Sequence, residues 1–103
     1  MKEKIQEIIL DSLKEFNEEK SKDEVLEISK DTVLLDVNGK LDSLDFVTLI
    51  VIIENNIFNK IGKNITIVSE KAFSKKYSPF KDVNTMTEFI VELLENEEWW
   101  LFL

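Results

Sequence analysis

The sequence contains no cysteine and no histidine. Without cysteine, the chain cannot form a disulfide, a thiolate metal site or a cysteine nucleophile. Without histidine, it lacks the side chain that most often serves as a general base and as a metal ligand. A catalytic site would need a serine–lysine or carboxylate arrangement, and no recognisable one is present. We therefore expect that the protein is not an enzyme.

Glycine and proline are also scarce, with two glycines and one proline among 103 residues. Strands joined by tight turns normally use more of both. The composition therefore favours a helical fold in which these residues mark a few corners. A chain of this length is expected to form one domain with its own core. We expect a single domain over residues 1–103, with its core over about 2–97 and an apolar tail over 98–103.

Acidic residues outnumber basic ones by 21 to 13, which gives a formal net charge of −8. This charge argues against nucleic acid as a partner, because the phosphates would repel it. It suits basic protein partners, although many soluble domains are simply acidic. No signal peptide is visible, and no apolar stretch approaches the roughly 20 residues that a membrane span needs. We expect a cytoplasmic protein.

Apolar residues recur at helical spacing in three long segments of the chain. The first predicts a helix over about 2–18. The second predicts a helix that begins at Asp42 or Ser43 and ends near 61, where Gly62 can adopt the left-handed conformation. The third predicts a helix over about 86–97 or beyond, because Thr85 and the acid three residues later have the spacing of a capping box.

The connections between these helices are less regular. Residues 28–39 show no sustained period and predict a long loop. Its expected apolar anchors are Ile28, Val33, Leu35 and Val37. A short helix is expected near 69–74, before Pro79 breaks the chain. The predicted fold class is all-α: a small bundle of three main helices, a short helix before the last one, and a long loop after the first.

The tripeptide Asp42-Ser43-Leu44 opens the second predicted helix. A phosphodiester on Ser43 Oγ would lie where backbone N–H groups and the helix dipole favour an anion. Asp42 and Ser43 are, however, also ordinary N-cap residues. The tripeptide alone arises by chance in roughly a few per cent of chains of this length. It leaves both a modification site and a simple cap as interpretations.

The wider segment Asn38-Gly39-Lys40-Leu41-Asp42-Ser43-Leu44 resembles the modification site of acyl and peptidyl carrier proteins. The order of elements is similar too: an amphipathic helix, a long loop, the serine at a helix start, and Glu54 within that helix. A short helix and a final helix after Val83-Asn84-Thr85 complete the pattern. The resemblance spans roughly residues 1–95.

This resemblance implies a function for Ser43. A phosphopantetheinyl transferase would attach 4′-phosphopantetheine from coenzyme A, with magnesium, to that serine. The arm would then carry an acyl or aminoacyl group as a thioester, loaded by a ligase and delivered to enzymes of fatty acid, polyketide or nonribosomal peptide biosynthesis. A monomer is expected.

The chain also departs from the family pattern. Gly39 lies four residues before Ser43, where carriers of fatty acid synthesis usually have a glycine three residues before it. The second helix extends through residues 58–61, and the connection over 69–80 is long. These features resemble specialised stand-alone carriers, and they leave the acyl group and the pathway open.

A partner-recognition face is expected at the start of the second helix. It combines three acids with three apolar residues that share one side by helical spacing. Its members are Asp42, Leu44, Asp45, Val47, Val51 and Glu54. The alternative is that some of the apolar residues pack under the long loop.

The rival function, from a different class, is an unmodified acidic helical adaptor in which Ser43 is merely a cap. A calcium-binding loop around Gly39 is excluded, because Leu34 would occupy the first ligand position of an EF-hand and a leucine side chain cannot coordinate calcium. The apolar tail Trp99–Leu103 is expected to pack on the last helix, and the alternatives are contact with a partner or with a membrane surface.

Overall fold

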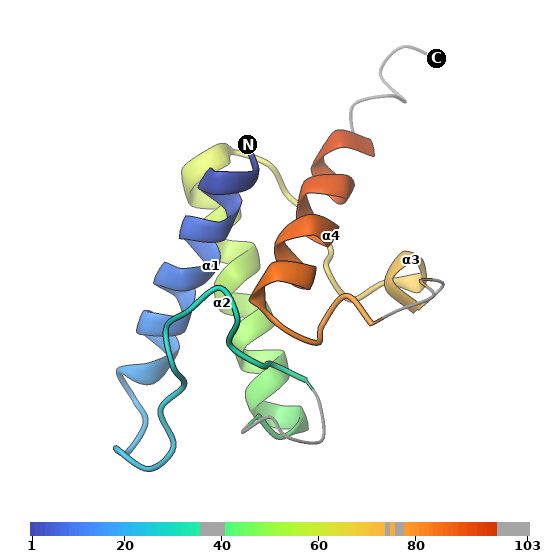
Figure 1. The fold of residues 1–103 in the computed structure, drawn as a ribbon. Helices are drawn as coiled ribbons and strands as arrows, with labels where there is room; N and C mark the ends of the chain where they lie inside the picture. Colours follow the sequence, from blue (N-terminus) through green and yellow to red (C-terminus); the bar gives the residue numbers. More distant parts are fainter. Residues whose placement is uncertain (36–40, 74, 76–77, 97–103) are drawn as a thin grey trace.

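The computed structural model describes residues 1–35, 41–73, 75 and 78–96. In these ranges it contains α1 (Lys2–Asn17), α2 (Ser43–Ile61), α3 (Glu70–Phe73) and α4 (Val83–Asn96). Helix α1 contacts both α2 and α4; it runs antiparallel to α2, and short α3 lies to one side (Figure 1). The predicted all-α class, with three main helices and one short one, is confirmed. None of the described helices is long and apolar enough to cross a membrane.

The three long helices share one core. Each buries an apolar stripe at three- and four-residue steps, as the sequence period requires. In α2 the fully buried members are Leu49, Ile53 and Ile57. Burial of each such side chain contributes about 1.5–3 kcal/mol. From α1 and α4 the buried apolar residues are Ile5, Ile8, Ile9, Leu13, Phe16, Val83, Met86, Phe89, Ile90 and Leu94.

The ends of α2 follow from local chemistry. Asp42 is the N-cap residue and has extended backbone angles. Gly62 follows the last helical residue with φ of 79°, and its N–H donates to the carbonyl of Phe58 at 2.9 Å. Only glycine adopts this left-handed conformation without strain. The predicted helix end at residue 61 is confirmed.

The long loop after α1 is held against the segment that precedes α4. The Leu34 N–H donates to the Lys81 carbonyl at 2.7 Å, and the Leu35 N–H to the Phe80 carbonyl at 2.9 Å. Val33 and Asp82 form an isolated antiparallel bridge. These hydrogen bonds give partners to loop N–H groups that have none within a helix. They hold the described part of the loop in a defined path.

The predicted anchors of this loop are wrong in part. Its buried leucines in the described residues are Leu26, Leu34 and Leu41, whereas Ile28 and Leu35 are exposed. The reason is geometric: in extended backbone, successive side chains point to opposite sides. Leu34 therefore points inward and Leu35 outward, and the sequence has too short a pattern to choose between them. The fourth predicted anchor, Val37, lies outside the described residues.

The start of the last helix was predicted three residues too late. Asp82 Oδ1 accepts a hydrogen bond from the Thr85 N–H at 2.8 Å, and Thr85 Oγ1 accepts one from the Asp82 N–H at 3.1 Å. This reciprocal pair is a capping box, so α4 begins at Val83. Thr85 is thus the last residue of the box, three residues after the cap Asp82, and not the cap itself. The predicted short helix near 69–74 is confirmed as α3.

Leu34 and Leu35 provide a direct test of this loop register. We predict that Leu34→Ala lowers the free energy of unfolding by about 2–5 kcal/mol, because it leaves a cavity in the core. Leu35→Ala should lower it by less than about 1 kcal/mol, because that side chain is already partly in water. Urea unfolding monitored by far-UV circular dichroism measures both. Equal losses for the two variants would contradict the register.

Candidate functional site

Ser43 is the first residue of α2, and its side chain is exposed. The capping role belongs to its neighbour, because Asp42 Oδ1 accepts a hydrogen bond from the Asp45 N–H at 2.8 Å. Within the described part of the chain, the Ser43 hydroxyl has no hydrogen-bond partner. Of the two cap residues that the sequence left open, the structure uses Asp42. The hydroxyl of Ser43 is therefore exposed and takes no part in the hydrogen bonds among the described residues.

The backbone around Ser43 also favours an anion. The first hydrogen bond of the helical ladder runs from the Phe46 N–H to the Asp42 carbonyl at 2.9 Å. Asp45 donates its N–H to the cap, which leaves the N–H groups of Ser43 and Leu44 without acceptors among the described residues. Such unpaired N–H groups at a helix start can donate to a phosphate. The site thus fits a phosphodiester on Ser43.

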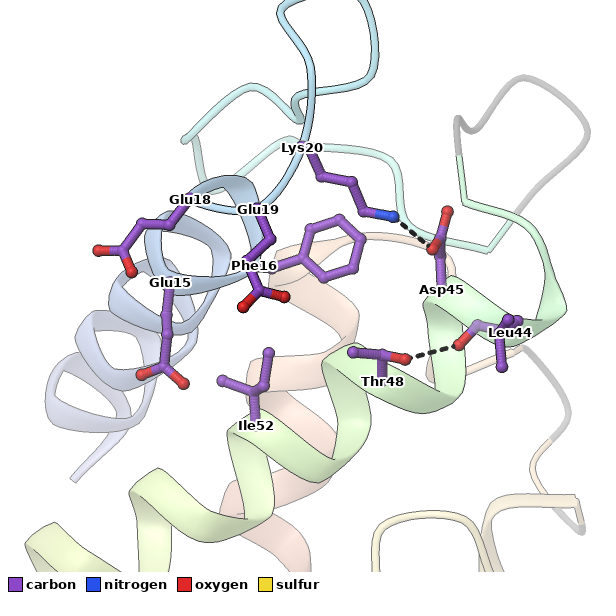
Figure 2. A pocket seen from close by; sticks show the side chains of 9 residues that line it. All are labelled: Glu15, Phe16, Glu18, Glu19, Lys20, Leu44, Asp45, Thr48 and Ile52. Atoms are coloured by element: carbon purple, nitrogen blue, oxygen red, sulfur yellow. Dashed lines mark hydrogen bonds and ion pairs between the residues drawn. The ribbon is translucent and has the colours of Figure 1, made fainter.

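One ion pair joins the start of α2 to the loop that follows α1. Lys20 Nζ lies 2.7 Å from Asp45 Oδ1 and 5.0 Å from the centre of the Phe16 ring. The hydrogen bond to Asp45 raises the pKa of Lys20, and the negative charges of Asp45, Glu24 and Asp42 raise it further. Figure 2 shows Lys20, on the loop that follows α1, reaching Asp45 in the first turn of α2. Asp45, predicted for the partner face, therefore already has an intramolecular partner.

An acidic cleft of about 390 Å³ lies beside this ion pair, between the end of α1 and the first half of α2 (Figure 2). The α1 side contributes three exposed carboxylates, and the α2 side contributes Leu44, Thr48 and Ile52. The carboxylates are those of Glu15, Glu18 and Glu19. Sequence reasoning missed these acids, because only the pairing of α1 with α2 brings them near Leu44 and Thr48.

The apolar members of the predicted partner face are all exposed. The exposed fractions are 75% for Leu44, 56% for Val47 and 48% for Val51. The alternative that they pack under the long loop is therefore wrong. Phe58, which sequence reasoning did not assign to this face, is 54% exposed and follows Val51 by seven residues. Its helical spacing to Leu44 and Val51 was the signal that could have found it.

Glu54 has a different environment from the other predicted members of the face. Its Oε2 atom accepts a hydrogen bond from the Ile67 N–H at 2.8 Å. This bond holds the connector after α2 against the middle of the helix, where Ile65 and Ile67 are buried. Glu54 lies eleven residues after Ser43, about 16 Å along the helix. Its role in partner recognition stays a prediction.

No group of three acids in the described ranges could hold a metal ion. Comparisons with protein-family models, with curated proteins and with solved structures find no match to this chain.

Substitution of Asp42 and of Ser43 tests which of the two residues caps α2. We predict that Asp42→Ala lowers the free energy of unfolding by about 1 kcal/mol, because the Asp45 N–H loses its acceptor. Ser43→Ala should change it by less than about 0.5 kcal/mol, since the hydroxyl makes no described contact. Chemical denaturation of the two variants checks this. A larger loss from Ser43→Ala would show that the serine is the cap.

The Lys20–Asp45 pair should give a pH-dependent stability at alkaline pH. Because the pKa of Lys20 is raised above its ordinary value of 10.5, the pair stabilises the fold below that value. Its contribution is lost as the pH rises through the raised pKa. The free energy of unfolding of Lys20→Gln should thus be lower than that of the protein without a substitution. This difference should be constant up to about pH 10 and shrink above it.

Urea unfolding of both proteins across this pH range tests the pair, with Asp45→Asn as a matched control. In the Asp45→Asn background, Lys20→Gln should cause little further change at any pH. A deficit that persists unchanged to about pH 12 would contradict the assignment.

Proposed function

We propose that the protein is a carrier protein of the acyl and peptidyl carrier type, modified on Ser43 with 4′-phosphopantetheine. The observation that carries the proposal is the state of Ser43: exposed, at a helix start, and relieved of capping by Asp42. The absence of histidine is consistent with it, because a transferase and not this chain would supply the base. The proposal places the protein in the cytoplasm as a monomer.

In the modification step, Ser43 Oγ forms a bond to the phosphorus of coenzyme A that bears the pantetheine group. The bond from that phosphorus to the oxygen bridging the two phosphates breaks, and adenosine 3′,5′-bisphosphate leaves. A base of the transferase takes the hydroxyl proton, and magnesium neutralises the phosphates. The N–H groups of Ser43 and Leu44, which have no acceptor among the described residues, would donate to the new phosphodiester.

When attached, the arm supplies a terminal thiol that holds an acyl or aminoacyl group as a thioester. This chain's own part is to present the arm at one end of the bundle and to be recognised by each partner in turn. The partners would be the transferase, a loading ligase and downstream biosynthetic enzymes. The exposure of Leu44, Val47 and Val51 supports recognition through small apolar contacts beside the serine.

A second candidate is an unmodified acidic helical adaptor. The exposed apolar face of α2 favours it, because that face needs no modification to bind a partner. In this alternative, replacing Ser43 would leave partner binding intact. In the carrier, the same replacement would abolish function.

Intact mass spectrometry distinguishes the two functions. The protein is incubated with coenzyme A, magnesium and a broad-specificity phosphopantetheinyl transferase. We predict that the protein without a substitution gains one phosphopantetheine and that Ser43→Ala gains none. The variant Ser21→Ala, which removes an exposed serine in the loop after α1, is the matched control and should be modified. A gain on Ser43→Ala, or none on any folded form, would count against the carrier.

A further inference from the structure

An open cavity of about 520 Å³ lies between α4 and the connector that precedes this helix. We call it the α4 cavity. The helix contributes Thr85, Glu88, Phe89 and Glu92 to its lining, and the connector contributes the opposite wall, which includes Lys75. Cavities that hold a ligand typically measure about 300–1,000 Å³. The α4 cavity is therefore large enough to receive bulky side chains.

Phe89 gives this cavity an aromatic surface that is fixed in place. Its side chain is buried, and its ring meets the ring of Phe80 edge-on, with the ring centres 6.2 Å apart. Lys75 Nζ lies 5.9 Å from the centre of the Phe89 ring and pairs with the carboxylate of Glu92. An incoming aromatic side chain would find a ring edge to pack against and an ammonium group to lie beside.

The α4 cavity lies on the side of α4 from which the chain continues. Positions 85, 89 and 92 follow one another at steps of four and three residues, and the next step of four reaches position 96. Asn96 is the last residue of α4. It follows Glu92 by about 6 Å and Phe89 by about 10 Å along the helix axis. The segment that follows α4 therefore starts above the cavity.

That segment, residues 97–103, lies outside the described residues, but its sequence suits a return over the cavity. It reads Glu97-Glu98-Trp99-Trp100-Leu101-Phe102-Leu103. Asparagine is favoured at the first position of a β-turn, so a turn over 96–99 would reverse the chain and leave the two acids in water. Four further extended residues cover about 13 Å. This length reaches back past Glu92 to Phe89.

We propose that residues 97–103 fold back over α4 and that Trp100 and Phe102 occupy the α4 cavity. These two side chains share one side of an extended segment, because side chains alternate. Trp100 would lie beside the ammonium group of Lys75, and Phe102 would lie further along, at Phe89. The same segment of a second copy is a poorer occupant, since each copy carries a net charge of −8 and like charges repel.

This proposal goes beyond the proposed carrier function and does not rest on it. The lining of the α4 cavity does not include Ser43. The variant Ser43→Ala should therefore keep the segment docked, even though it could not be modified. Failure of modification and failure of docking are then two different results.

Tryptophan fluorescence reports on this segment alone, because Trp99 and Trp100 are the two tryptophans of the sequence. The variant Trp99→Phe leaves Trp100 as the fluorophore, and Trp100→Phe leaves Trp99. Each is titrated with acrylamide beside a free peptide of residues 95–103 that carries the same substitution. We expect acrylamide to quench Trp100 at least about twofold less in the protein than in its peptide, because docking removes the indole from water. Trp99, in the turn, should be less protected.

Nuclear magnetic resonance locates the contact in the full chain. We expect nuclear Overhauser effects from the Trp100 indole to the side chain of Lys75, and from the Phe102 ring to the ring of Phe89. Replacement of both tryptophans by serine should shift the amide signals of Lys75, Phe89 and Glu92. The signals of residues 20–30, on the loop after α1, should stay where they are.

A matched pair of variants tests the lysine beside the indole. Lys75→Gln should make Trp100 about twofold more accessible to acrylamide, because the ammonium group that faces the indole is lost. Lys22→Gln removes the same charge from an exposed residue of the loop after α1 and should leave the quenching unchanged. Both are made in the Trp99→Phe background, and far-UV circular dichroism verifies that each variant is folded.

Several results would overturn the proposal. They are quenching of Trp100 equal to that in the peptide, contacts of the indole with another part of the protein, or equal effects of Lys75→Gln and Lys22→Gln. Protection that disappears on dilution, with a dimer in sedimentation equilibrium, would place the segment in a second copy. Protection that arises only with added vesicles of phosphatidylcholine and phosphatidylglycerol would assign it to a lipid surface.

Discussion

Burial of one face of α2 is the constraint on which the rest of the structure depends. Leu49, Ile53 and Ile57 are fully buried against the other helices, and a helix that buries one face has no freedom in which face it exposes. The same packing that holds the core therefore turns Leu44, Val47, Val51 and Phe58 to solvent. It also sets the start of α2 beside the end of α1, where Lys20 and Asp45 meet. Fold and candidate site are consequences of one helix orientation.

At the start of α2, two adjacent polar residues have different tasks. Asp42 stabilises the helix through the Asp45 N–H, while Ser43 lies one residue further on with its hydroxyl exposed. A residue that caps its own helix cannot be modified at the capping oxygen without loss of that bond. Separation of the two tasks leaves the serine chemically available without cost to the fold. This is the physical link between the sequence motif and the proposed carrier function.

Strong helical periods made the elements predictable from the sequence, including the end of α2 at Gly62 and the exposure of Leu44. The misses have local physical causes. Leu34 and Leu35 were interchanged because the extended segment is too short for its alternation to show which side faces the core. The start of α4 was misplaced because Asp82 and Thr85 form an earlier capping box. The acidic cleft could not be predicted, since its carboxylates meet α2 only after the two helices pack.

The central claim is that the hydroxyl of Ser43 carries a phosphopantetheine arm in the cell. The most direct measurement is fragmentation mass spectrometry of the protein recovered from the cells that naturally make it, without any added transferase. We predict that at least a fraction of the peptide containing Asp42, Ser43 and Leu44 carries phosphopantetheine, with the fragment series placing it on the serine. Recovery of this peptide wholly unmodified, from cells whose other carrier proteins bear the arm, would contradict the account.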